Sequence, residues 1–391
     1  MRKFGVMAAL TLLTSLIGIG GQAPAGPSAG GISSDNVEFI RHIPFGTSGV
    51  GGRLIKGYFY ATDQNKLMIY DTKNPEDPQL QGVLPMVDQP IFSREDVDTN
   101  GKILILPNQN GGGPNTCDTE TRQCVVNKLY VIDVEDKTNP KVLATVPGAA
   151  QHTNSCILKC TYAYGSEGNI VDLRNPRKPK LLKEKWGDPD KPARNGHDVT
   201  EIAPGLVLTS TQPIMLLDAR KDPVHPKVLA VGASKDGRFI HTGIWPRGGK
   251  DKFLLMAGET NFTVQCGDKN GAFMTWDASK WKKKHTFSMI DEYRMGNGTY
   301  IDGKPAHNAV GCSSHWHEAN PKFHNGGLVA AAFFEHGTRF IKVSSKGKIS
   351  ETGYFMPHVG STGAVYWVND RVLYAMDYTR GIDVIKFTGK L

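Results

Sequence analysis

The chain has 391 residues, of which 44 are glycine and 23 proline, and its formal net charge at pH 7 is +8. Since no long segment has sustained helical periodicity, the composition argues against a helical domain and favours a fold of strands and turns. The basic residues lie mostly in turns and form no stripe with interleaved aromatic residues, so a nucleic-acid partner is not expected.

The N-terminus has the form of a secretory signal peptide. Arg2 and Lys3 precede an apolar run, residues 4–20, and small residues follow it. We expect residues 1–25 to be a signal peptide that is cleaved near residues 25–29, leaving a secreted or periplasmic protein without a stable membrane span. An uncleaved membrane anchor is the alternative, and the shortness of the apolar run argues against it.

The first predicted strand is Asn36–Pro44, and after it a repeated phrase begins. The phrase is a short apolar run that ends in Asp, a polar turn that is often rich in proline, and a second apolar run, which predicts two neighbouring antiparallel strands. The copies are Lys66–Leu84, Lys128–Val146, Gly168–Glu184, Ile214–Val231, Ala272–Ile290, Arg339–Phe355 and a truncated Gly381–Leu391.

The aspartates that end the first apolar run are predicted to be structural, because an Asp side chain can accept a hydrogen bond from the backbone two residues on and so start a turn. They are Asp71, Asp133, Asp172, Asp218 and Asp277.

Two further strands fit between successive copies of the phrase. The predicted inner segments are Gly57–Thr62; Val97 with Ile103–Leu106; His152–Ile157 with Thr161–Tyr164; His197–Ile202 with Leu206–Ser210; Phe239–Trp245 with Phe253–Ala257; His315–Ala319 with Leu328–Phe334; and Ala364–Val368 with Val372–Met376. Four strands repeated seven times predict an all-β fold, a single seven-bladed β-propeller over residues 36–391. The seventh copy ends after its third strand, so we expect Asn36–Pro44 to complete the last blade and leave no free edge there.

Six cysteines in an exported chain indicate disulfide bonds. One pair brackets a polar loop, a second flanks a tight hairpin, and the remaining two could meet across a blade boundary. The predicted bonds are Cys117–Cys124, Cys156–Cys160 and Cys266–Cys312. A metal-binding or redox pair is the alternative for Cys156 and Cys160.

Several inner strands are preceded or opened by histidine. Inner strands line the channel of a propeller, so side chains near their starts converge on one mouth. Neutral imidazole is a ligand for copper, zinc, iron and nickel. The predicted metal ligands are His152, His197, His241, His315 and His317. Because His315 and His317 are two residues apart, a regular strand would place them on the same face.

Acidic residues beside these histidines are the predicted catalytic groups. Glu95, Asp198 and Glu318 are expected to orient imidazole N–H groups or to act as general bases. The alternative is structural: polar groups at the end of a propeller channel also bind water and one another without any catalytic role.

The runs LYVIDV, NIVDLRNPRKPKLL and IMLLDARKDPVHPKVL resemble the LVIVD repeat of extracellular bacterial β-propellers, over nearly all of the mature chain. The Gly196-His197-Asp198 segment, followed by Pro204 and residues 207–211, more distantly resembles the inner-blade pattern of the selenium-binding protein or methanethiol oxidase family. That second resemblance implies a copper ion held by channel histidines and thiol oxidation as an activity to test, although the family's Cys-rich motifs are not found here.

Together these features predict an exported propeller with a metal site, copper by preference, at the channel mouth. It would act as an oxidoreductase on a small-molecule substrate. The alternative is a non-catalytic scaffold that uses its glycine-rich insertions to bind an extracellular protein or glycan ligand. A third hypothesis, a metal-dependent hydrolase of the propeller lactonase kind, would require more carboxylates and asparagines around the ion.

Overall fold

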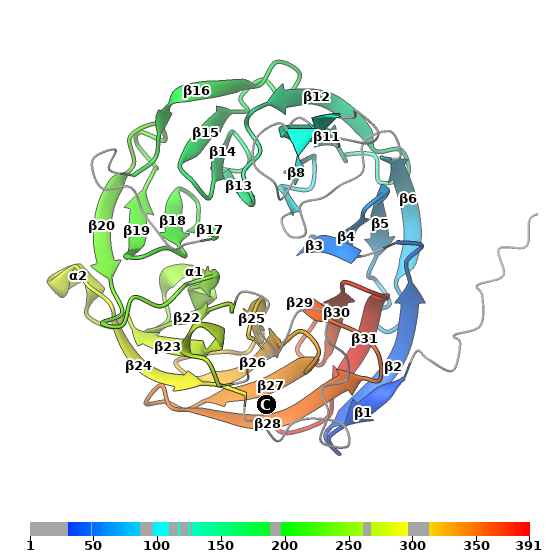
Figure 1. Cartoon of the computed structure of the whole chain (residues 1–391), viewed down its shortest axis with the longest axis vertical. Helices are drawn as coiled ribbons and strands as arrows, with labels where there is room; N and C mark the ends of the chain where they lie inside the picture. Colours follow the sequence, from blue (N-terminus) through cyan, green and yellow to red (C-terminus); the bar gives the residue numbers. More distant parts are fainter. Residues whose placement is uncertain are drawn as a thin grey trace, which may run out of the picture.

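The computed structural model describes residues 30–47, 49–86, 97–108, 127–187, 197–260, 267–295 and 313–391, and the backbone of 116–117 and 124–125. Strands in these residues form seven antiparallel blades around a central axis, so the predicted seven-bladed β-propeller is confirmed (Figure 1). Among the same residues no helix is long and apolar enough to cross a membrane. The predicted signal peptide lies outside them.

The blades follow one another in chain order. Blade 1 contains β3 (Gly49–Ile55), β4 (Tyr58–Asp63), β5 (Lys66–Asp71) and β6 (Gln79–Pro85); blade 2 contains β7 (Asp98–Thr99), β8 (Ile103–Asn108), β11 (Lys128–Asp133) and β12 (Lys141–Pro147), with the hairpin β9 (Thr116–Cys117) and β10 (Cys124–Val125) inserted. Blade 3 contains β13 (Asn154–Ile157), β14 (Tyr162–Gly165), β15 (Asn169–Asp172) and β16 (Lys180–Lys185); blade 4 contains β17 (Val199–Ala203), β18 (Leu206–Thr209), β19 (Ile214–Asp218) and β20 (Lys227–Gly232).

The remaining blades carry the short helices and both ends of the described chain. Blade 5 contains β21 (Thr242–Ile244), α1 (Pro246–Gly249), β22 (Phe253–Ala257), η1 (Lys269–Gly271), β23 (Phe273–Asp277), α2 (Trp281–Lys284) and β24 (Ser288–Tyr293). Blade 6 contains β25 (His317–Ala319), β26 (Gly327–Ala332), β27 (Thr338–Val343) and β28 (Ile349–Pro357), with β1 (Gly31–Ser33) as a fifth strand; blade 7 contains β29 (Thr362–Trp367), β30 (Val372–Asp377), β31 (Gly381–Phe387) and β2 (Val37–Pro44).

The repeated phrase forms the third and fourth strands of blades 1 to 6, and its truncated last copy forms the third strand of blade 7, as predicted. Each of its five aspartates accepts a hydrogen bond from the backbone N–H two residues later, at 2.8–3.1 Å. In blades 1 to 6 the register of these two strands shifts once within the ladder, and such a bulge bends and twists the outer strand. The aspartates therefore have the structural role that their position indicates.

The inner strand of blade 1 was missed in the sequence. The prediction gave this blade only one inner strand, near Gly57–Thr62, whereas β3 precedes it. The sequence of β3 is GVGGRLI, and glycine is depleted in strands. Packing explains the glycine, since a Cβ atom added to Gly52 would lie 2.7 Å from the Phe59 ring.

The N-terminal strand closes the ring, as predicted. Strand β2 pairs antiparallel with β31, and Val37 faces Phe387 in the ladder. Strand β1, which the sequence did not predict, adds to the edge of blade 6 by pairing with β28. Phe39 of β2 stacks on Phe355 of β28, with ring centroids 5.2 Å apart, so the closing strand also contacts the preceding blade.

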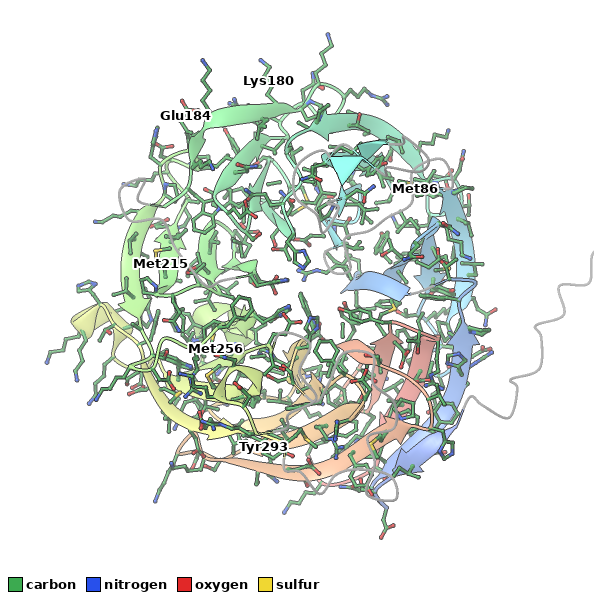
Figure 2. The ribbon with its side chains drawn as sticks, viewed as in Figure 1. Met86, Lys180, Glu184, Met215, Met256 and Tyr293 are labelled. Carbon is green, nitrogen blue, oxygen red and sulfur yellow. A yellow bond between two sulfur atoms is a disulfide. The ribbon has the colours of Figure 1, made fainter. Side chains whose placement is uncertain are left out.

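The core lies between the blades. In the described residues, seven clusters of buried hydrophobic side chains each join the facing surfaces of two neighbouring blades around the ring. Polar residues of the fourth strands, such as Lys180 and Glu184, lie on the outer rim (Figure 2). Because burial stabilises each large apolar side chain by about 1.5–3 kcal/mol, these clusters hold the inner strands in a fixed arrangement around the axis.

The disulfide prediction is confirmed for Cys156–Cys160, which closes the turn between β13 and β14. Leu158, Lys159 and Cys160 all have positive φ, between 52° and 60°, a conformation that is unfavourable for side chains other than glycine. Cys117 and Cys124 are paired opposite each other in the β9–β10 ladder. The predicted Cys266–Cys312 bond lies outside the described residues.

We expect the Cys156→Ala/Cys160→Ala variant to unfold at lower denaturant concentration, with a loss of about 2 kcal/mol in the free energy of unfolding. The reason is that the bond restricts a short loop in the unfolded chain, so the loop loses less conformational entropy when it folds into the left-handed turn. Urea unfolding without reductant measures the loss. A variant as stable as the oxidised wild-type protein would contradict this role of the disulfide.

Candidate metal centre

Four of the predicted histidines form a row at the channel mouth. His152, His197, His241 and His315 precede the inner strands of blades 3, 4, 5 and 6. The ring centroids of successive members are 4.3, 3.8 and 3.9 Å apart. These histidines are distant in sequence. They meet because each inner strand begins at the same end of its blade.

Within this row, potential ligand atoms gather in two groups. The first group is His197, Asp198 and His241, and the second is His241, Glu259 and His315; in each group the ligand atoms lie within 4.8 Å of one another. His241 belongs to both groups. Glu259 directs one carboxylate oxygen toward the Nε2 atom of His241 and the other toward the Nε2 atom of His315, each at 3.9 Å.

Hydrogen bonds fix which nitrogen of His241 carries a proton. The Thr242 hydroxyl donates its single proton to Asp198 at 2.8 Å, so its oxygen accepts from Nδ1–H of His241 at 2.6 Å. In the neutral imidazole, Nε2 then carries the lone pair. Asp198 also lies 3.1 Å from Nδ1 of His197. One carboxylate thus orients two of the imidazoles, an arrangement common around metal-bound histidine.

His315 is oriented in the same way by the backbone. Its Nδ1 lies 2.6 Å from the carbonyl oxygen of Gly363, which can only accept, so Nδ1 donates and Nε2 carries the lone pair. Two imidazole lone pairs and the carboxylate of Glu259 therefore face one another. His241 and His315 are at most 1% exposed, and a cation stabilises such an arrangement of buried electron-rich atoms.

His317 is placed differently from His315. Strand β25 begins at His317, so the alternation of a regular strand does not extend back to His315. The His317 ring packs edge-on against Phe273, and its Nε2 donates to the Leu255 carbonyl at 3.1 Å. Burial lowers the pKa of His317 to about 4, and the residue belongs to neither ligand group. His152, half-buried at the end of the row, is also in neither group.

The three predicted catalytic acids have three different outcomes. Asp198 lies with the histidines and orients them. Glu318 accepts a hydrogen bond from the Trp367 N–H at 2.8 Å and lines a separate cavity of about 340 Å³, which Arg247 also lines. Burial raises the pKa of Glu318 to about 7. Glu95 lies outside the described residues.

Glu259 was not selected from the sequence. It follows the second strand of blade 5, β22, whereas the predicted ligands all lie at the starts of the inner strands. Antiparallel pairing brings the end of β22 beside the start of β21, and hence Glu259 beside His241. An acidic residue just after a second strand is the signal that would have indicated it.

No protein-family model and no curated protein matches the sequence. Among solved structures the chain is similar to the WD40 repeats of RRP9 (TM-score 0.56, 10% identity, 92% of this chain and 99% of that chain) and to YCF48 bound to D1 peptide (0.52, 8%, 93% and 100%). It is also similar to the periplasmic gluconolactonase PpgL of Pseudomonas aeruginosa (0.57, 10%, 84% and 94%). These comparisons show the β-propeller fold, and they confirm neither the LVIVD repeat nor the selenium-binding family.

Proposed function

We propose that the channel mouth binds one transition-metal ion through His241, His315 and Glu259, with His197 completing the donor set. The observation that carries this proposal is that two imidazole lone pairs converge on one carboxylate. The Nε2 atoms of His241 and His315 each lie 3.9 Å from a different oxygen of Glu259. The burial of these histidines supports the proposal, because a bound cation would offset the cost of placing electron-rich groups away from water.

Copper is the preferred metal. Imidazole nitrogen suits copper, zinc, nickel and iron, and copper(II) heads the order of affinity among divalent ions of the first transition row. A bound copper ion would supply one-electron redox chemistry. The side chain of Glu259 is 22% exposed, so it is the member of the group that an incoming molecule would meet first and that could take up its proton.

On this basis the protein is proposed to be a metal-dependent oxidoreductase of a small molecule. An exported location, secreted or periplasmic, fits the Cys156–Cys160 disulfide, since such bonds persist in oxidising compartments. The periplasmic gluconolactonase of the same fold is compatible with that location.

A non-catalytic binding scaffold is the second candidate. The histidine rings are already in mutual contact, at centroid distances of 3.8–4.3 Å, and a purely structural cluster would also have this feature. A propeller of this fold, YCF48, has been solved with a bound peptide, which is consistent with such a role.

Metal analysis of protein purified without a histidine tag separates the two candidates. We expect about one equivalent of copper per chain after incubation with Cu²⁺ and dialysis, and its removal by a strong chelator. The His197→Ala/His315→Ala variant should retain its circular dichroism spectrum and lose the metal. Oxygen uptake with a panel of small reductants then tests activity. A folded wild-type protein that retains no copper, zinc, nickel or iron would support the scaffold instead.

A further inference from the structure

The turn between β23 and β24 of blade 5 differs from the other turns of the repeat. Where blades 1 to 4 have proline-containing turns, residues 279–285 read SKWKKKH and form the helical turn α2. Lys282, Lys283 and Lys284 are exposed, and in Figure 1 the turn projects from the outer edge of the ring. This departure from the repeat concentrates positive charge beside one tryptophan.

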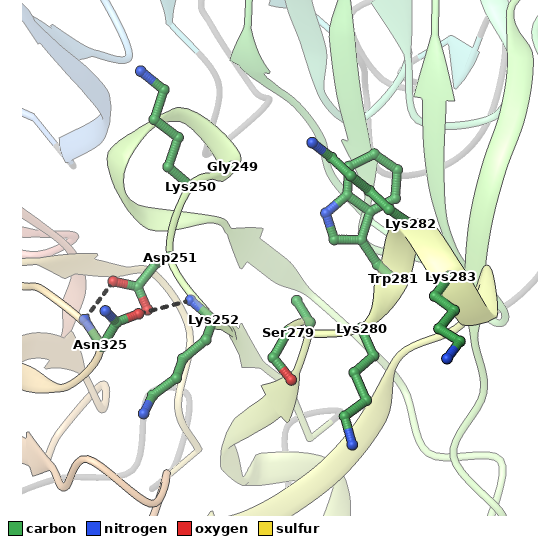
Figure 3. A pocket seen from close by; sticks show the side chains of 11 residues that line it. Gly249, Lys250, Asp251, Lys252, Ser279, Lys280, Trp281, Lys282, Lys283 and Asn325 are labelled. Atoms are coloured by element: carbon green, nitrogen blue, oxygen red, sulfur yellow. Dashed lines mark hydrogen bonds between the residues drawn. The ribbon is translucent and has the colours of Figure 1, made fainter.

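The turn forms one wall of a pocket of about 650 Å³ (Figure 3). The loop between β21 and β22 and Asn325 of blade 6 form the other walls. The lining includes Lys250, Lys252, Lys280, Lys282, Lys283 and Trp281. Its volume lies within the range of about 300–1,000 Å³ that is typical of sites for small molecules.

The charge of the pocket is strongly positive. Five lysines line it, and the one acidic residue, Asp251, is buried and accepts backbone N–H groups of Phe253 and Asn325 at 3.2 and 2.6 Å. In the described part of the chain no carboxylate lies within 4.0 Å of the amino groups of four of these lysines, which are Lys250, Lys280, Lys282 and Lys283. The pocket thus presents positive charge that no neighbouring acid in the described residues neutralises.

Trp281 adds an apolar surface with a fixed orientation. The residue is half-buried, and its ring meets the Trp245 ring edge-on with centroids 5.7 Å apart. The amino group of Lys282 lies 5.7 Å from the centre of the Trp281 ring. Figure 3 shows the Lys282 side chain beside this ring. An indole beside ammonium groups suits a ligand that combines an apolar face with negative charge.

We propose that this pocket binds an acidic sugar unit: a sugar ring that carries carboxylate, sulfate or phosphate, either free or at the end of a glycan. The sugar ring would lie beside Trp281, and its anionic group would pair with Lys282 or, on the other side of the indole, with Lys280 and Lys283, whose amino groups point away from that of Lys282 (Figure 3). The concave shape favours a compact ligand over a membrane surface or a nucleic-acid duplex, which need a broad contact face.

The pocket and the metal centre are separate. His241 precedes β21, while the loop 245–252 follows that strand, so the two sites lie at opposite ends of it and on opposite faces of the propeller. The sugar-binding proposal therefore does not depend on the proposed metal chemistry.

Calorimetric titration tests the proposal on the full chain at about 150 mM salt, where long-range attraction is screened. The probes are a heparin-derived hexasaccharide, a hexamer of galacturonic acid, neutral maltohexaose and inorganic sulfate. We expect the two acidic oligosaccharides to bind more tightly than sulfate, and maltohexaose not to bind. The Lys282→Glu/Lys283→Glu variant should weaken that binding by roughly tenfold or more.

The matched control is Arg177→Glu/Lys178→Glu, which makes the same change of charge in the corresponding exposed turn of blade 3. This variant should leave the affinity for the acidic oligosaccharides within about twofold of the wild-type value, since both residues lie outside the pocket. Equal losses in both variants would overturn the proposal in favour of attraction by net charge. It would also be overturned if neither acidic oligosaccharide bound, or if single-stranded DNA or anionic vesicles bound more tightly through the same two lysines.

Discussion

The His241→Ala variant is expected to lose metal binding, with an affinity for Cu²⁺ at least roughly 100-fold below that of the wild-type protein. Since His241 supplies a ligand atom to both groups at the channel mouth, its removal leaves each group with a single histidine. Competition against a chelator of known affinity measures the change. Any oxidase activity should disappear with the metal.

Two further variants test whether the loss of metal binding is specific to the site around His241. Thr242→Val removes the hydroxyl that fixes the His241 tautomer and should weaken metal binding by about 10–100-fold while leaving every ligand in place. His225→Ala changes an exposed histidine of blade 4 and should have no effect. A folded His241→Ala protein that still binds one equivalent of copper with wild-type affinity would show that the site lies elsewhere.

The second large effect concerns acid stability and comes from His336, which follows β26. Burial, together with the positive charge of Arg339, lowers the pKa of His336 to about 4 from an ordinary value of 6.5. Between these values the unfolded chain takes up a proton that the folded protein does not bind, so stability falls as the pH falls from about 6.5 to about 4. A pKa shift of this size corresponds to a loss of about 3 kcal/mol in the free energy of unfolding across this pH range.

The His336→Gln variant should therefore lose about 3 kcal/mol less stability than the wild-type protein between pH 7.5 and pH 4. Urea unfolding at both pH values measures the difference, and His225→Gln on the exposed turn of blade 4 serves as the control. The variant retains some acid sensitivity, because His317 shifts in the same direction, and Glu318 partly opposes both, since its raised pKa favours the folded state at low pH. An unchanged pH dependence would rule out His336 as a source of acid sensitivity.

Much of the fold could be predicted because its signals are local. The aspartates of the repeat accept bonds from the backbone two residues away, so their role is visible in a short stretch of sequence. Ring closure by β2 followed from counting strands. In contrast, β3 was missed because it is rich in glycine, and at least one of these glycines, Gly52, is required by its contact with Phe59, which depends on packing and leaves no strand-like pattern.

The sequence predicted only those residues of the candidate site whose positions follow from the register of the inner strands. The histidines before the inner strands of blades 3 to 6 meet because every inner strand starts at the same mouth. Glu259 depends on antiparallel pairing within blade 5, and the separation of His315 from His317 depends on where β25 begins. These are three-dimensional details that residue spacing does not contain.

The seam at blade 7 has a kinetic consequence. Its outer strand, β2, comes from the beginning of the chain and its other three strands from the end, so the ring can be completed only by contacts between segments more than 300 residues apart. Contacts of such long range form slowly, because bringing the two segments together costs chain entropy before any contact stabilises them. Once formed, the contacts of the seam keep the ring closed. Loosening the stack of Phe39 on Phe355 would therefore shorten the lifetime of the folded ring more than it would slow its assembly.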